Sequence, residues 1–132
     1  MNWPIALVFF VLFDLLLLGY VLYKRSRRKF SVADRSYFLE QWSRIADGHD
    51  IRHAVMDADK LLNVVLRKMG YQGGVGDQLK KAQKLFSDLN GVWSAHKLRN
   101  RMAHELELSF VSREGGRALK QFERALRDLG AL

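Results

Sequence analysis

A continuous apolar run from Trp3 to Tyr23 constrains this chain more than any other feature. As a helix, the run spans roughly 31 Å, about the thickness of a bilayer hydrocarbon core. Fourteen of its residues are Leu, Ile, Val or Phe, and together they favour insertion by roughly 4–8 kcal/mol. Asp14, near the middle, costs about 2.5–3.5 kcal/mol. The balance predicts a transmembrane helix; the alternative is a buried helix of a soluble core.

The charges that flank the apolar run predict its orientation. No Lys or Arg precedes it, and a basic cluster follows it: Lys24, Arg25, Arg27, Arg28 and Lys29. A secretory signal peptide has the opposite order. The positive-inside rule therefore predicts a single-pass anchor over residues 1–29 of a cell (inner) membrane, with the N-terminus outside and residues 30–132 in the cytoplasm. The basic cluster should also attract anionic membrane lipids. Asp14 is either a tolerated polar residue or, as we favour, a contact to a partner helix.

The composition of residues 30–132 narrows the class of protein. The chain has no cysteine, which excludes disulfides and thiolate metal sites. These residues carry 17 positive and 13 negative side chains, so their charge alone makes no strong case for nucleic-acid binding. One proline and no Ser/Gly/Pro-rich tract argue against long linkers. We expect one small domain over residues 30–132.

Apolar residues recur at helical spacing through this domain, with no convincing alternation of period two. We expect an all-α fold, an antiparallel bundle of about five cytoplasmic helices with short connections. The expected helices run from Ser31 to Asp47, from Asp50 to Lys68, from Asp77 to about Leu89, around Trp93 to an end between His104 and Leu108, and from Ser112, with Gly115-Gly116 marking the start, to Leu129. Residues 73–76 should form an interhelical turn. Residues 106–111 are the strongest strand candidate but are too short and isolated to assign.

The helix around residues 93–105 holds the candidate chemistry. At about 100° per residue, Ala95, Leu98, Met102 and Leu106 form a core stripe. The opposite side is a polar strip of His96, Arg99, Asn100, Ala103, His104 and Glu107. A histidine can move protons to and from a ribose 2′-hydroxyl, and an arginine can neutralise charge on phosphoryl oxygens. An asparagine can orient either one. These residue types suit phosphodiester chemistry without a metal.

The spacing of the strip leaves its geometry open. Arg99 and His104 are separated by roughly 140° on a straight helix, with the small Ala103 between them. His96, Asn100 and His104 step by four residues and can touch in sequence. A shared cleft between two copies of the chain would ease the angular separation of Arg99 and His104.

The segment Arg99-Asn100-Arg101-Met102-Ala103-His104 resembles the Arg-x4–6-His signature of the HEPN superfamily, in which a polar residue commonly follows the arginine. The resemblance extends over about residues 50–129 as a helix pattern. It implies an all-α, HEPN-like bundle that dimerises with its motif helices facing each other. Many members are metal-independent endoribonucleases of toxin–antitoxin, phage-defence or RNA-processing systems. The resemblance therefore implies RNA as substrate, a homodimer, an antitoxin-like partner protein, catalysis by Arg99 and His104, and assistance from Asn100.

Two other readings of these residues stay open. His96 and Arg101 are further candidates for substrate binding beside the motif. The same strip can instead serve as structural hydrogen bonds in a non-catalytic, membrane-tethered dimerisation or adaptor module.

His49 and His53 have the spacing of a zinc pair, but no third ligand of fixed spacing is visible, so we expect no metal and no cofactor. A membrane anchor departs from the commonest soluble toxins and suits a membrane-localised sensor or defence component.

Overall fold

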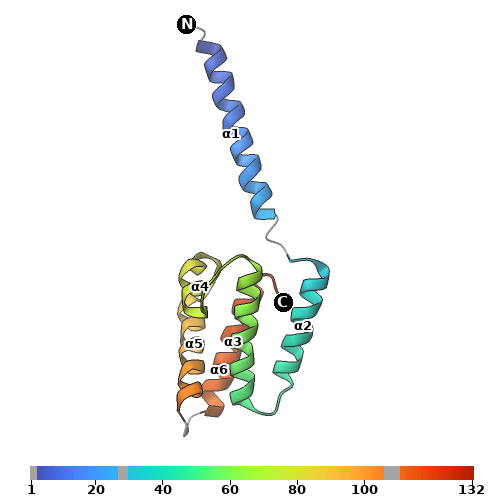
Figure 1. The fold of residues 1–132 in the computed structure, drawn as a ribbon, viewed down its shortest axis with the longest axis vertical. Helices are drawn as coiled ribbons and strands as arrows, with labels where there is room; N and C mark the ends of the chain where they lie inside the picture. Colours follow the sequence, from blue (N-terminus) through green and yellow to red (C-terminus); the bar gives the residue numbers. More distant parts are fainter. Residues whose placement is uncertain (1–2, 27–29, 106–110) are drawn as a thin grey trace.

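The computed structural model describes residues 3–26, 30–105 and 111–132, and over these residues the chain is all helical (Figure 1). The described part contains six α-helices and one short 3-10 turn, with no strand. The elements are α1 (Trp3–Ser26), α2 (Val32–Ala46), α3 (Ile51–Lys68), α4 (Val75–Lys81), η1 (Gln83–Leu85), α5 (Leu89–His104) and α6 (Val111–Asp128). The all-α expectation is confirmed.

Helix α1 stands apart from the bundle (Figure 1). Its segment Trp3–Tyr23 has a mean hydropathy of 2.7, and none of it is buried. It is long and apolar enough to cross a membrane. The buried hydrophobic residues of the described part all follow α1; the largest fully buried ones are Phe38, Leu62, Leu66, Leu79, Met102, Phe122 and Leu126. The bundle therefore has its own core, to which residues 3–23 of α1 contribute nothing.

The first two helices of the bundle begin directly after Ser31 and Asp50, the residues at which the sequence predicts their starts, and both residues cap them. The Ser31 hydroxyl accepts a hydrogen bond from the backbone N–H of Asp34 at 3.1 Å. The Asp50 carboxylate accepts from the backbone N–H groups of Arg52 and His53 at 2.8 and 3.2 Å. These bonds, led by the one from the His53 backbone, hold the pKa of Asp50 below its ordinary value. Each cap satisfies backbone donors that a helix start leaves unpaired.

The third helix differs from the prediction. It was expected to start at Asp77 and continue to about Leu89, but α4 starts at Val75 and ends at Lys81, before η1. The fully buried side chain of Gln78, in the middle of α4, donates to Asn63 Oδ1 and to the carbonyl of Tyr71, both at 3.1 Å. These bonds fasten the short helix and the preceding turn to α3, a long-range constraint that periodicity does not contain.

Helix α6 is described from Val111, one residue before the expected Ser112 and directly after residues that lie outside the described part. Gly115 and Gly116 lie inside it, so they do not mark its start. A Cβ on Gly115 would lie 2.5 Å from Ile51 Cγ1, so this glycine allows α6 to pack closely against α3. The strand candidate at 106–111 falls mostly on residues 106–110, outside the described part.

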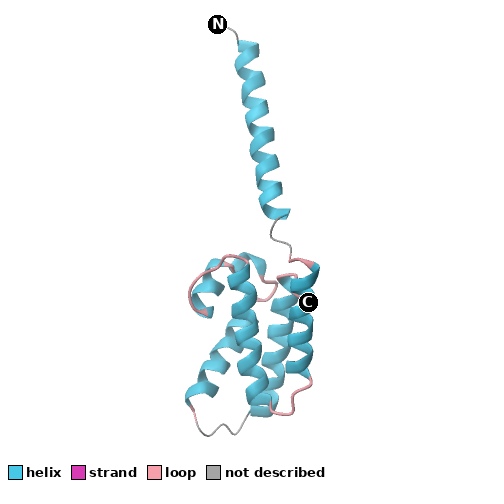
Figure 2. Cartoon of the chain, turned by 45° about the vertical axis from the view of Figure 1, so that its right-hand side comes forward, coloured by secondary structure: helices cyan, strands magenta, loops and turns pink. Residues whose placement is uncertain are grey.

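Cross-links between the helices define two ends of the bundle, which Figures 1 and 2 show from two sides. At the end where the chain enters from α1, Lys68 at the close of α3 pairs with Asp34 at the start of α2, at 2.6 Å. The Ser87 backbone and hydroxyl donate to Asp128 at the close of α6. We name this the near end. The opposite, far end holds the start of α3 and the close of α5, which Arg52 joins.

Candidate functional site

Helix α5 carries the candidate motif and is oriented by an apolar stripe. Ala95, Leu98 and Met102 are buried, as predicted; Leu106 lies outside the described residues. The Asp88 carboxylate caps the start of the helix by accepting from the Gly91 backbone N–H at 2.9 Å. The helix ends at His104, within the predicted window. The motif therefore runs from the middle of α5 to its end at the far end of the bundle.

A buried carboxylate from α3 organises the middle of the motif helix. Asp59 Oδ1 lies 2.8 Å from His96 Nδ1, and Asp59 Oδ2 lies 3.4 Å from Arg99 Nε. The side chain of Asp59 is only 4% exposed, against 12% for His96 and 28% for Arg99. A carboxylate this deep requires partners, because an unpaired buried charge is strongly unfavourable. Asp59 is thus the acceptor that draws two predicted site residues together.

Asn100 contacts both His96 and Arg99, so that these three side chains and Asp59 form a closed ring of contacts. Its Oδ1 accepts from Arg99 Nη1 at 3.0 Å, and its Nδ2 lies 3.4 Å from His96 Nε2. His96 Nδ1 therefore faces the Asp59 carboxylate, and His96 Nε2 faces the Asn100 amide. We call Asp59, His96, Asn100 and Arg99 the polar ring. Each member has two neighbours within it, and the Arg99 guanidinium is held by its hydrogen bond to Asn100 and its ion pair with Asp59, while its buried Nε makes no hydrogen bond.

His104 lies outside the polar ring. Its side chain is exposed, and it makes no hydrogen bond or ion pair with Arg99 or with any other residue that the structure describes. The end of the helix is nevertheless fixed, because Arg52 of α3 donates to the carbonyls of Met102 and Glu105, the latter at 2.5 Å. A cation is favourable at a helix C-terminus, where carbonyls are unpaired. Arg52 therefore holds the backbone at His104 in place, while the His104 imidazole stays exposed to solvent.

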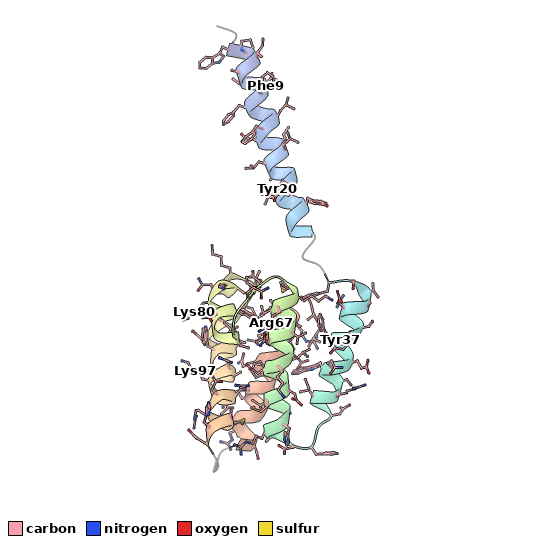
Figure 3. The ribbon with its side chains drawn as sticks, viewed as in Figure 1. Phe9, Tyr20, Tyr37, Arg67, Lys80 and Lys97 are labelled. Atoms are coloured by element: carbon pink, nitrogen blue, oxygen red, sulfur yellow. The ribbon has the colours of Figure 1, made fainter. Side chains whose placement is uncertain are left out.

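Arg101 lies on another face of the helix. With Lys97 it lines a groove of about 570 Å³ between α5 and α6, together with Glu114 and Arg117. Arg101 is 3.9 Å from the Glu114 carboxylate and 3.8 Å from that of Glu105. Figure 3 places Lys97 on the side of α5 away from α3. The five predicted site residues thus occupy three places: the polar ring, the α5–α6 groove and the exposed helix end.

The sequence reasoning missed Asp59 and Arg52. Both come from α3 and are seven residues apart, two helical turns, so they lie on one face. A usable signal was present: a carboxylate and a guanidinium interrupt an otherwise apolar stripe on one helix face. Their partners on α5 are 37 to 53 residues away in the chain, which a local pattern cannot supply.

His49 lies just before α3, and His53 lies in its first turn. His49 and His53 are both exposed, and His53 Nδ1 lies 2.8 Å from Asp50 Oδ2. Within the described residues, no group of three or more His, Cys, Asp or Glu side chains could hold a metal ion. His53 is therefore a partner of the helix cap.

Comparison with known proteins returned no similarity: no protein-family model, no curated protein and no solved structure matches the chain. The HEPN resemblance thus rests on the Arg-x4–6-His segment and the helix pattern alone.

Proposed function

We propose that the chain is a membrane-anchored, HEPN-like protein whose domain of residues 30–132 is a metal-independent endoribonuclease. One observation carries the proposal. The Arg99 guanidinium is oriented by a buried carboxylate yet stays 28% exposed, and an exposed imidazole follows at the end of the same helix. Catalytic groups act best when neighbouring residues hold them in place and a substrate can still reach them.

Each residue then has a role in cutting an RNA phosphodiester. His104 exchanges protons with the ribose 2′-hydroxyl or the leaving oxygen. Arg99 neutralises the charge that builds on the phosphoryl oxygens. Asn100 holds Arg99 through the 3.0 Å bond to Nη1, and His96 positions Asn100. Arg101 faces the α5–α6 groove and binds the RNA backbone there.

The active unit is a homodimer in this proposal. Arg99 and His104 are roughly 140° apart around α5, and no described contact joins them within one chain. Two copies packed with their motif helices facing each other bring the arginine of one copy towards the histidine of the other. His104 is free for such a contact because its ring is exposed.

The proposed location is the inner membrane. Helix α1 is apolar and long enough to span it, and the basic residues 24–29 follow the span on one side only. The positive-inside rule places the bundle in the cytoplasm. An antitoxin-like partner that controls the nuclease there belongs to the same proposal.

The test is cleavage of single-stranded RNA by the full chain in nanodiscs, in the presence of a chelator. We expect cleavage by the wild-type chain, and a loss of about 100-fold or more in His104→Ala and Arg99→Ala. His49→Ala is the matched control, since His49 is also an exposed histidine. Thermal unfolding verifies that each variant is folded. Equal cleavage by His104→Ala and wild type would refute the proposal.

A non-catalytic adaptor is the second candidate, and the burial of the polar ring favours it. Asp59, His96 and Arg99 are exposed by 28% or less, as expected of a structural network. In that case no variant cuts RNA. Arg99→Ala then lowers dimer affinity or stability by about 1–3 kcal/mol, while His104→Ala changes neither.

A further inference from the structure

The positive charge of the bundle is concentrated in one segment. Residues 67–85 contain five cations, Arg67, Lys68, Lys80, Lys81 and Lys84, and a single carboxylate, Asp77. The remainder of residues 30–132 contains 12 positive and 12 negative side chains. The whole net charge of +4 on the bundle therefore comes from these 19 residues. We name the five cations the basic patch.

The basic patch lies at the near end of the bundle. Arg67 and Lys68 are in the last turn of α3, and the three other lysines are in α4 and η1. Figures 1 and 3 show α4, with Lys80, in the part of the bundle nearest to α1. All five side chains are exposed. Lys80 and Lys84 make no hydrogen bond or ion pair with another described residue, so their charges are available.

The chain itself keeps this end close to any membrane that α1 crosses. Ser26 closes α1, and Phe30 opens the bundle. Four residue steps cover at most about 14 Å, and the apolar span ends at Tyr23, roughly 4.5 Å of helix before Ser26. Val32, in the first turn of α2, is 85% exposed, which places an apolar side chain at the same end. The near end thus cannot move far from the headgroups.

We propose that the basic patch docks the bundle on the anionic lipid headgroups of the leaflet that it faces. The proposal rests on the membrane anchoring of α1 and is independent of the nuclease activity. Each Lys or Arg beside an anionic leaflet strengthens the attraction about fivefold. Docking turns the far end towards the aqueous phase. His104, at the opposite end of α5, is then about 22 Å of helix further from the membrane than Leu89.

The absence of cysteine in the chain makes a site-directed probe specific. A nitroxide on Gln83→Cys, an exposed position between Lys80 and Lys84, monitors the patch. A nitroxide on Ser43→Cys, exposed near the close of α2, monitors the other end. The full chain is placed in vesicles of phosphatidylcholine alone or with about 30 mol % phosphatidylserine, which mimics an anionic leaflet. Electron paramagnetic resonance measures access of a water-soluble nickel complex to each probe.

We expect phosphatidylserine to protect the Gln83 probe and to leave the Ser43 probe accessible. Salt at about 1 M should remove the protection, because it shortens the screening length to about 3 Å. Lys80→Glu with Lys84→Glu should lower the ratio of docked to undocked bundle by about 25-fold or more. Lys60→Glu with Lys120→Glu changes the total charge equally at exposed positions elsewhere and should preserve protection. Equal access in both lipids, or equal loss in both double variants, would overturn the docking.

The outcomes separate this proposal from the others. If the protein stays in the membrane but phosphatidylserine does not protect the Gln83 probe, the docking proposal is wrong and the anchor proposal stands. Extraction of the protein by alkaline carbonate refutes the anchor, and the docking with it. If RNA binding falls in Lys80→Glu with Lys84→Glu and phosphatidylserine gives no protection, the patch is a nucleic-acid surface and the lipid proposal is wrong.

Discussion

Helix α5 makes two contacts of opposite character. Towards α3 it places His96 and Arg99 against the buried carboxylate of Asp59. Towards α6 it places Lys97 and Arg101 on the rim of an open groove, where Arg101 lies 3.9 Å from the Glu114 carboxylate. The charged residues are of similar type on both sides, so the difference comes from the neighbouring helix. α3 offers a carboxylate 4% exposed, and α6 offers Glu114, which is much more solvated.

The comparison shows where charge contributes to stability. A buried ion pair is costly to break, because the remaining charge stays desolvated. An exposed pair gains little, because water and salt screen it. The α3 contact should therefore hold α5 through its polar groups, while the α6 contact should hold it through apolar packing around Ala95, Leu98 and Ala118. Substitutions of Asp59, Arg52 and Glu114 test this difference.

Asp59→Ala should cause the largest loss, about 3 kcal/mol in the free energy of unfolding. The value is at the low end for a buried pair because Arg99 retains 28% exposure. Urea unfolding of residues 30–132, which contain the complete core, measures it. A double-mutant cycle with Arg99→Ala should give a coupling energy of about 0.5–3 kcal/mol. A loss below about 1 kcal/mol for Asp59→Ala would show that the two contacts do not differ.

Arg52→Ala should cost less, about 1–2 kcal/mol, since it removes a charged donor to two helix-terminal carbonyls that water can partly replace. Arg52→Lys should recover part of the loss, because an ammonium keeps the charge but not the fork of donors. The same unfolding experiment measures both variants. If Arg52→Ala is as stable as wild type, the close of α5 is held by other contacts.

The parts of the fold that depend on neighbours along the chain were predictable from the sequence. Caps at Ser31, Asp50 and Asp88 act over two or three residues, and apolar spacing identified the buried side of α5. The predicted polar strip was less uniform than its pattern suggested. Arg99 lies about 40° from Ala95 around the helix, close enough to the core edge to meet a carboxylate from α3.

The parts that depend on distant residues were not predictable. Asp59 meets His96 across 37 residues, and Arg52 reaches Met102 across 50. Gly115 resembled a helix start in sequence but serves close packing against Ile51. In each case the deciding partner lies on another helix, so the local pattern gives the residue type without its environment. Arg99 and Arg101 lie on different faces because two residues turn a helix by about 200°, but the neighbours that each face meets are set by α3 and α6.

Glu114→Ala should have the smallest effect, within about 0.5 kcal/mol of wild type. Among the described residues, Glu114 is the one carboxylate that lines the α5–α6 groove, and its side chain is 44% exposed, at 3.9 Å from Arg101. Removing it ends an ion pair that solvent already screens. Urea unfolding in low and high salt measures the change in the free energy of unfolding. Asp59→Ala is measured under the same conditions for comparison. A loss above about 1 kcal/mol would mean that charge fastens α5 to α6 as it does to α3, because exposed pairs do not reach that value.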